Sequence, residues 1–158
     1  MPRRPTPMTP AAIAADLYAV VRDALDLFHH VDETRTSERP RDGGWCAREI
    51  LGHLVDSACN NHRRFVIGRD QPPIVFQGYN QDDWVARQQY AQVPFRDIVA
   101  LWAAYNRHLA HLIAVTPPAA LEQSGEGPDG TVTLGFLMED YVTHLRHHLG
   151  QLHSLLKP

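Results

Sequence analysis

Residues 133–156 read TLGFLMEDYVTHLRHHLGQLHSLL, and their apolar spacing is typical of an amphipathic helix. An α-helix turns about 100° per residue, so a set of apolar and aromatic side chains falls on one face of this stretch. That face consists of Leu134, Leu137, Tyr141, Leu145, Leu152 and Leu155. Thr133 is of a residue type that caps helix N-termini. The stretch therefore predicts a long helix, from Thr133 to about Leu156, that buries one face in a core.

Two histidines on this helix point the same way. His148 lies about 40° from His144 around the helix axis, within the apolar face, whereas His147 is turned about 60° outward. Imidazoles at positions i and i+4 of a helix are a common arrangement for chelating zinc. We therefore predict that His144 and His148 act as a pair and that His147 is not a metal ligand.

Three earlier stretches carry similar helical spacing. The first covers about residues 9–31 and the second about residues 45–68. The third begins at Pro94, and its inward face is predicted to consist of Ile98, Leu101, Trp102, Tyr105, Leu109 and Leu112. Four amphipathic helices of this length indicate an all-α protein built as a four-helix bundle.

The segments between these helices are rich in proline and glycine, which favour turns and loops. Residues 34–44, 70–78 and 116–130 are predicted to be irregular, and residues 80–90 to form a short helix capped by Asn80. No run shows the sustained alternation of a strand. We therefore expect one bundle domain over residues 10–158 and a disordered tail over residues 1–9. The connections between the second and third long helices and between the third and fourth are expected to be long.

The second long helix offers one histidine that matches the pair. His53 flanks the apolar stripe of that helix, so its ring can reach into the bundle. Glu49 and Asp56 lie within about 60° of it and could accept a hydrogen bond that fixes the tautomer of a metal-bound ring. Tyr141, on the inward face of the last helix, is a further candidate for supporting the ligands or for catalysis. Three imidazoles leave one position of a tetrahedral ion open for water or substrate.

The segment between the second and third long helices carries Tyr79, Asp82 and Trp84, which could border a substrate pocket. The alternative is a short capped helix whose Trp84 packs in the core. The histidines have a similar alternative, since a histidine at the edge of an apolar face is commonly a packed side chain without a ligand. Periodicity alone leaves these alternatives open.

Composition argues against several classes of protein. A net charge of −3 with scattered arginines disfavours a nucleic-acid partner, which needs a concentrated basic face. No apolar run approaches the ~20 residues of a membrane span, and residues 1–9 lack the apolar core of a secretory signal. Cys46 and Cys59 lie about 20 Å apart on one predicted helix, too far for a disulfide. We therefore expect a cytoplasmic protein with neither a nucleic-acid nor a membrane partner.

Three motifs resemble those of one known family. Residues 44–57 read GWCAREILGHLVDS, which is similar to a W-x-x-x-E-x-x-x-H-L-x-D-S motif. Residues 144–152 read HLRHHLGQL, which resembles an H-x-x-H-H-x-x-Q ending followed by an apolar residue. Residues 79–84 read YNQDDW, which resembles a Y-x-x-x-x-W segment. Together and in this order, the motifs resemble the DinB-like family of four-helix metalloproteins, which includes YfiT-like proteins and bacillithiol transferases.

This resemblance implies a DinB/YfiT-like four-helix bundle with one metal ion bound by His53, His144 and His148. It implies a divalent transition metal, zinc in first place with nickel or iron as alternatives. Relatives include hydrolases and thiol transferases that use a low-molecular-weight thiol as cosubstrate, and members often form homodimers. We therefore expect a metal-dependent enzyme that activates a thiol or water and acts on a small molecule. The alternative is a metal-binding stress-response protein without catalytic turnover.

Overall fold

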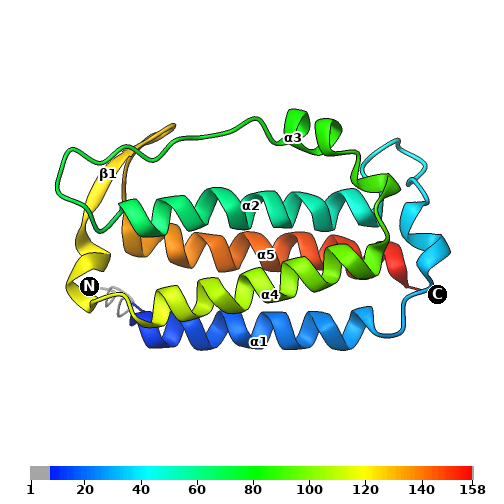
Figure 1. Ribbon diagram of the computed structural model, residues 1–158, viewed down its shortest axis with the longest axis horizontal. Coiled ribbons are helices and arrows are strands. Elements are labelled where there is room, and N and C mark those ends of the chain that lie inside the picture. The colour runs from blue at the N-terminus through cyan, green and yellow to red at the C-terminus, as the bar shows by residue number, and fades with distance from the viewer. Residues whose placement is uncertain (1–7, 158) are drawn as a thin grey trace, which may run out of the picture.

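Four long helices lie side by side along the length of the molecule (Figure 1). They are α1 (Pro10–Phe28), α2 (Ala47–Ile67), α4 (Phe95–Ala114) and α5 (Leu134–Leu156). The structure is a computed structural model that describes residues 8–157. Most of the tail expected to be disordered therefore lies outside the described residues. Within them, Thr9 caps α1, because its side chain accepts a hydrogen bond from the Ala12 N–H (3.2 Å).

Successive long helices are not always neighbours in this bundle. Both α1 and α2 pack against α4 and α5, so α1 and α2 face each other across one diagonal and α4 and α5 across the other. Figure 1 shows α2 and α4 running in the same direction, opposite to α1 and α5. A connection must therefore cross a diagonal or return along the whole bundle, which requires long segments. The predicted four-helix bundle with long connections is confirmed.

Short helices punctuate the connections. They are η1 (Glu33–Ser37), α3 (Gln81–Gln88), η2 (Tyr90–Gln92) and η3 (Pro118–Glu122). The predicted short helix near residue 80 is α3, and its cap is as expected, since the Asn80 side chain accepts a hydrogen bond from the Asp83 N–H (3.1 Å). It ends at Gln89, whose φ of 50° is left-handed and cannot continue a helix.

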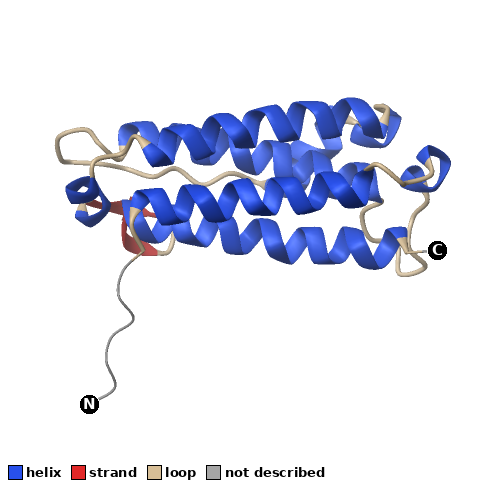
Figure 2. Ribbon diagram, turned by 90° about the horizontal axis from the view of Figure 1, so that it is seen from below, coloured by secondary structure: helices blue, strands red, loops and turns tan. Residues whose placement is uncertain are grey.

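A β-hairpin within residues 116–133 corrects the expectation of an irregular loop without strands. Its strands are β1 (Ser124–Gly127) and β2 (Gly130–Thr133), drawn red at one end of the bundle in Figure 2. Gly130, with a φ of 121°, makes the tight turn possible. The hairpin also fastens the long connection between α2 and α4, because Phe76 N–H donates to Glu126 O (2.8 Å). Strands of four residues are too short to show a sustained alternation.

Apolar side chains from all four long helices form one core. Examples without measurable exposure are Leu17 of α1, Phe65 of α2, Trp102 of α4 and Met138 of α5. Burial of these side chains supplies the main driving force for assembling the bundle. Within residues 8–157, no helix combines the length and the apolar character needed to cross a bilayer.

Leu101 does not belong to this core, contrary to the expectation from the sequence. Its side chain is 54% exposed, whereas that of the neighbouring Trp102 is fully buried. Leu101 lies about 120° around the helix axis from Phe95 and Ile113, which are buried at the centre of the inward face of α4. The prediction was wrong because it assigned too wide an arc of α4 to the core.

The connection after α3 approaches α2 very closely at Gly52. A Cβ atom on Gly52 would lie 2.2 Å from ring atoms of Tyr90, which belongs to η2. Glycine therefore allows the Tyr90 ring to lie against α2. The Tyr90 hydroxyl donates a hydrogen bond to Asp56, one turn further along α2 (2.7 Å). This contact holds the connection over the part of α2 that carries His53.

Candidate metal centre

Three histidines from two helices converge on one point. His53 comes from α2, and His144 and His148 come from α5, which packs against α2. The Nε2 atom of His144 lies 3.2 Å from that of His53 and 3.1 Å from that of His148. Three nitrogens bound to one tetrahedral zinc ion at about 2.1 Å lie about 3.4 Å apart. The spacing therefore fits a shared metal ion.

Hydrogen bonds among the rings do not satisfy this cluster. The His144 Nε2 atom faces two other Nε2 atoms at hydrogen-bonding distance but carries at most one proton. The His148 Nδ1–H donates to Gln151 Oε1 (2.8 Å), which leaves the lone pair of the His148 Nε2 directed at the cluster. A cation accepts all three lone pairs at once. The donor set therefore fits a divalent transition metal.

The outer nitrogens of the other two rings are less firmly held. His144 Nδ1 lies 3.5 Å from Ser57 Oγ, at the limit of a hydrogen bond. His53 Nδ1 is buried without a hydrogen-bond partner among residues 8–157. The Trp45 ring packs against the His53 ring, with centroids 5.2 Å apart. Packing rather than hydrogen bonding therefore orients His53.

Burial keeps these imidazoles neutral. It lowers the pKa of His53 to about 3 and that of His144 to about 4, and in both cases the charge on His148 adds to the effect. The pKa of His148 is also lowered, again by burial first. Neutral imidazole is the form that binds a metal ion. All three side chains are therefore ready to coordinate at neutral pH without losing a proton.

Glu49 and Asp56 have partners other than His53 in the described part of the chain. The Glu49 carboxylate accepts two hydrogen bonds from the Arg39 guanidinium (2.9 and 2.6 Å) and one from the Cys46 N–H (3.0 Å). Burial opposes ionisation of Glu49, but these bonds outweigh it and lower its pKa. Glu49 thus caps α2 and anchors the preceding loop.

Asp56 accepts hydrogen bonds from the Tyr90 hydroxyl and from the Gln88 amide, both at 2.7 Å. Burial raises its pKa, and the two hydrogen bonds partly offset the rise. Its other oxygen, Oδ2, is buried without a hydrogen-bond partner within residues 8–157. In this arrangement Asp56 fastens η2 and α3 to α2.

Tyr141 forms its side-chain hydrogen bond with Asn106 rather than with a histidine of the cluster. Its hydroxyl donates to Asn106 Oδ1 (2.6 Å), and both side chains are buried between α4 and α5. Burial raises the pKa of Tyr141 well above its ordinary value. The phenol therefore stays protonated and links two helices of the core.

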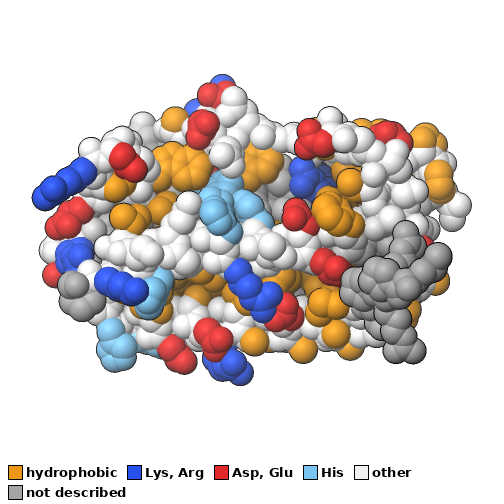
Figure 3. Space-filling model, turned by 180° about the vertical axis from the view of Figure 1, so that it is seen from behind, with side chains coloured by type: hydrophobic (Ala, Val, Ile, Leu, Met, Phe, Trp, Pro, Cys, Tyr) orange, Lys and Arg blue, Asp and Glu red, His pale blue; other side chains and the backbone are white. Residues whose placement is uncertain are grey.

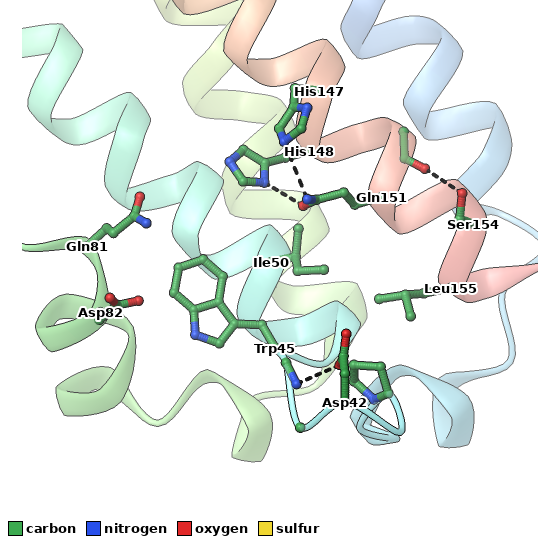
Figure 4. Close-up of a pocket in the computed structure, with 14 residues that line it drawn as sticks. Asp42, Trp45, Ile50, Gln81, Asp82, His147, His148, Gln151, Ser154 and Leu155 are labelled. Atoms are coloured by element: carbon green, nitrogen blue, oxygen red, sulfur yellow. Dashed lines mark hydrogen bonds between the residues drawn. The ribbon is translucent and has the colours of Figure 1, made fainter.

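An open cavity of about 870 Å³ lies beside the histidines, and His148 forms part of its wall (Figure 4). The wall combines the loop before α2, the start of α3 and the end of α5. Its lining residues are Pro40, Asp42, Gly43, Gly44, Trp45, Ile50, Gln81, Asp82, His147, His148, Gly150, Gln151, Ser154 and Leu155. Histidine side chains are also visible near the middle of the face shown in Figure 3, between apolar side chains.

The three residues predicted to border a substrate pocket divide between two hollows. Asp82 lines the cavity beside His148. Tyr79 and Trp84 line a separate hollow of about 450 Å³ on α2, together with Arg63 and Arg64. Burial, followed by the charge of Asp56, raises the pKa of Tyr79 to about 12. Trp84 is 36% exposed and packs on Tyr79, so it does not lie in the core.

Sequence reasoning missed two residues that contact the histidines. The helical spacing does not single out Gln151, although its position three residues after His148 places both on one face of α5. The helical spacing starts the second long helix at about residue 45, whereas the structure places Cys46 at the N-cap and Trp45 in the loop before it. Only the fold shows that the Trp45 ring reaches His53.

Fold and site together define a class: four-helix bundle proteins whose helices α2 and α5 carry a three-histidine candidate metal centre open to a cavity. The chain belongs to the DinB superfamily, whose family model matches residues 16–152. The resemblance seen in its motifs is thereby confirmed.

Curated relatives with similar sequences carry the same description. A protein of Oceanobacillus iheyensis named "Putative metal-dependent hydrolase OB0782" is 27% identical over 118 residues, which are 74% of this chain and 68% of that protein. A protein of Bacillus mycoides named "Putative metal-dependent hydrolase BcerKBAB4_2443" is 25% identical over 126 residues, which are 79% of this chain and 72% of that protein.

Two solved structures share the fold. YfiT from Bacillus subtilis, described as a probable metal-dependent hydrolase with an unusual four-helix bundle topology, superposes with a TM-score of 0.85 at 19% identity. The superposition covers 98% of this chain and 91% of YfiT. A mutant of the mycothiol-dependent maleylpyruvate isomerase superposes with a TM-score of 0.69 at 14% identity, covering 90% of this chain and 59% of the isomerase.

Proposed function

We propose that His53, His144 and His148 bind one divalent transition-metal ion, zinc in first place, and that the protein is a metal-dependent enzyme acting on a small molecule. One observation carries this proposal. Three Nε2 atoms from two helices meet at the spacing of metal ligands, and one of the three rings lines a cavity of about 870 Å³. Cavities of roughly 300–1,000 Å³ are the usual size for small-molecule sites.

The number of ligands favours catalysis over a purely structural role. Within residues 8–157, the group of side chains able to share an ion contains three members. A structural zinc site normally uses four protein ligands, whereas a catalytic site uses three and leaves one position for water or substrate. When bound, such an ion lowers the pKa of water or a thiol and polarises an electrophilic carbonyl.

The protein's own side chains supply the remaining functions. Gln151 holds the His148 ring, and Trp45 and Ile50 give the cavity an apolar wall that limits water around a bound substrate. Asp82 and His147 also line the cavity, where a carboxylate and an imidazole can form hydrogen bonds with a bound substrate. These groups can bind and orient a substrate beside the histidine cluster.

Hydrolysis is the first candidate reaction, and transfer of a low-molecular-weight thiol is the second. The names of the curated relatives support hydrolysis. The mycothiol-dependent isomerase that shares the fold supports a thiol cosubstrate. In both reactions a small nucleophile attacks an electrophile held in the cavity, so one site serves either.

A substrate screen tests this proposal. Protein loaded with zinc and protein stripped by a chelator are compared on esters, amides and alkylating electrophiles, each with and without a small thiol. We expect turnover that needs the metal, and a requirement for the thiol distinguishes the second reaction from the first. A broad panel without any metal-dependent rate would support the alternative of a non-enzymatic metal-binding protein.

A further inference from the structure

We infer that the cavity beside His148 selects small molecules that carry a cationic ammonium group and discriminates against anionic ones. This inference rests on the proposed function in one respect, namely that the cavity holds the substrate. It names the chemical class of that substrate or cosubstrate from the charges and the aromatic surface on the cavity wall.

The charged side chains of the wall have one sign. Asp42 and Asp82 line the cavity, whereas its lining contains neither lysine nor arginine. Neither carboxylate forms an ion pair within residues 8–157. Two arginines lie close to Asp42 in the sequence: Arg39 is held by Glu49 (2.6 Å), and Arg41 directly precedes Asp42 but does not line the cavity. The negative charge of the wall is therefore available to a ligand.

The two carboxylates come from different elements, and both line the cavity together with an aromatic ring. Asp42 belongs to the loop before α2, where its Oδ1 accepts a hydrogen bond from the Gly44 N–H (3.0 Å). Asp82 lies in the first turn of α3. Figure 4 shows them on opposite sides of the Trp45 ring. The face of an indole ring attracts a cation, and two carboxylates beside the ring add to this attraction.

With a metal ion bound, the two sides of the cavity would carry opposite charges. Three neutral imidazoles and a divalent ion would place two positive charges at one side of the cavity, opposite the carboxylates. A ligand can match both sides of the cavity if its nucleophilic or electrophilic end approaches His148 and its ammonium end lies over Trp45. An anionic group over Trp45 would instead be repelled by Asp42 and Asp82.

Three thiols of similar size test the inference on cobalt-loaded protein, whose visible spectrum changes when a thiol binds the ion. Thiocholine is cationic and cannot coordinate through its nitrogen. Mercaptoethanol is neutral, and mercaptopropanesulfonate is anionic. The ion alone favours the anionic thiol. We expect thiocholine to bind about tenfold more tightly than mercaptopropanesulfonate, since two exposed carboxylates each attract the cation and repel the anion modestly.

Matched variants assign the preference to the wall. Asp82→Asn should reduce the preference for thiocholine about threefold, and Asp42→Asn combined with Asp82→Asn should abolish it. Asp83→Asn is the control, because Asp83 is the neighbour of Asp82 in α3 but pairs with Arg87 (3.6 Å) outside the cavity. Equal binding of the cationic and anionic thiols by the wild type, or equal effects of Asp82→Asn and Asp83→Asn, would overturn the inference.

A second measurement separates the inference from the proposed function. Saturation-transfer NMR on chelated protein compares phenyltrimethylammonium with benzenesulfonate, neither of which needs the metal. If none of the thiols changes the cobalt spectrum, thiol transfer fails, while selective binding of phenyltrimethylammonium still supports the inference. Binding of benzenesulfonate at equal or greater strength would contradict the inference whatever the metal does.

Discussion

At the scale of single residues, the bond from His148 to Gln151 sets the direction of one lone pair. The Gln151 side-chain oxygen accepts the Nδ1 proton (2.8 Å), so the Nε2 atom is left free for the cluster. Such outer hydrogen bonds orient a metal-bound ring and raise its basicity. Of the three rings, His148 has the shortest hydrogen bond at its outer nitrogen, since His144 has Ser57 at 3.5 Å and His53 has no partner within residues 8–157.

Replacing Gln151 with alanine should therefore weaken metal binding about tenfold without removing a ligand. Competition against a chromogenic chelator measures the zinc affinity. Gln81→Ala is the matched control, because Gln81 lines the cavity and forms no hydrogen bond with the histidines. Unchanged affinity in Gln151→Ala would show that the ring is held by packing alone.

The lowered pKa values of His53 and His144 also predict how the metal-free protein responds to acid. Their folded pKa values of about 3 and about 4 lie below the value of about 6.5 expected in the unfolded chain. Below pH 6.5 the unfolded chain binds more protons, so the free energy of unfolding falls as the pH is lowered. Urea unfolding of chelated protein should show a loss of about 2–4 kcal/mol between pH 7 and pH 4.5.

The double variant His53→Gln, His144→Gln tests the origin of this slope. It lacks both titrating rings but keeps polar side chains of similar size, so its stability should depend less on pH over the same range. An equally steep slope in the variant would assign the acid sensitivity to other groups.

At the scale of elements, the contact between α2 and η2 explains why α2 contains a glycine. The Tyr90 ring packs against Gly52, and the Tyr90 hydroxyl donates a hydrogen bond to Asp56. The connection between α2 and α4 is therefore fixed to α2 next to His53. Helical spacing predicted α2 itself but gave no sign of this contact. Glycine within a helix is costly, and close approach of another segment is what explains its presence here.

A pair of glycine substitutions tests this explanation. Gly52→Ala should destabilise the protein by about 1–3 kcal/mol, because its Cβ would collide with Tyr90. Gly150→Ala, on the exposed side of α5 with nothing within 4 Å of its Cβ, should stabilise it by about 0.5–1 kcal/mol. Urea unfolding measures both. A Gly52→Ala protein as stable as the wild type would show that the Tyr90 contact is dispensable.

At the scale of the whole molecule, the arrangement of the helices determines which residues meet. The spacing of apolar side chains predicted the four long helices, and one face of α5 predicted the pairing of His144 with His148. Three outcomes depend on tertiary contacts and could not be read from spacing: the hairpin over residues 124–133, the exposure of Leu101, and the division of Tyr79 and Asp82 between two hollows. Local periodicity describes one helix at a time, whereas these features require knowing which element packs on which.

The most direct test of the account is the metal content of three proteins purified in parallel without added metal: the wild type, His147→Ala and His148→Ala. His147 and His148 are adjacent on α5, but only His148 belongs to the three-histidine cluster. Elemental analysis should find about one transition-metal ion per chain in the wild type and in His147→Ala, and a small fraction of that in His148→Ala. Equal loss of metal in both variants, or a wild type that takes up no metal when zinc is supplied, would contradict the three-histidine centre.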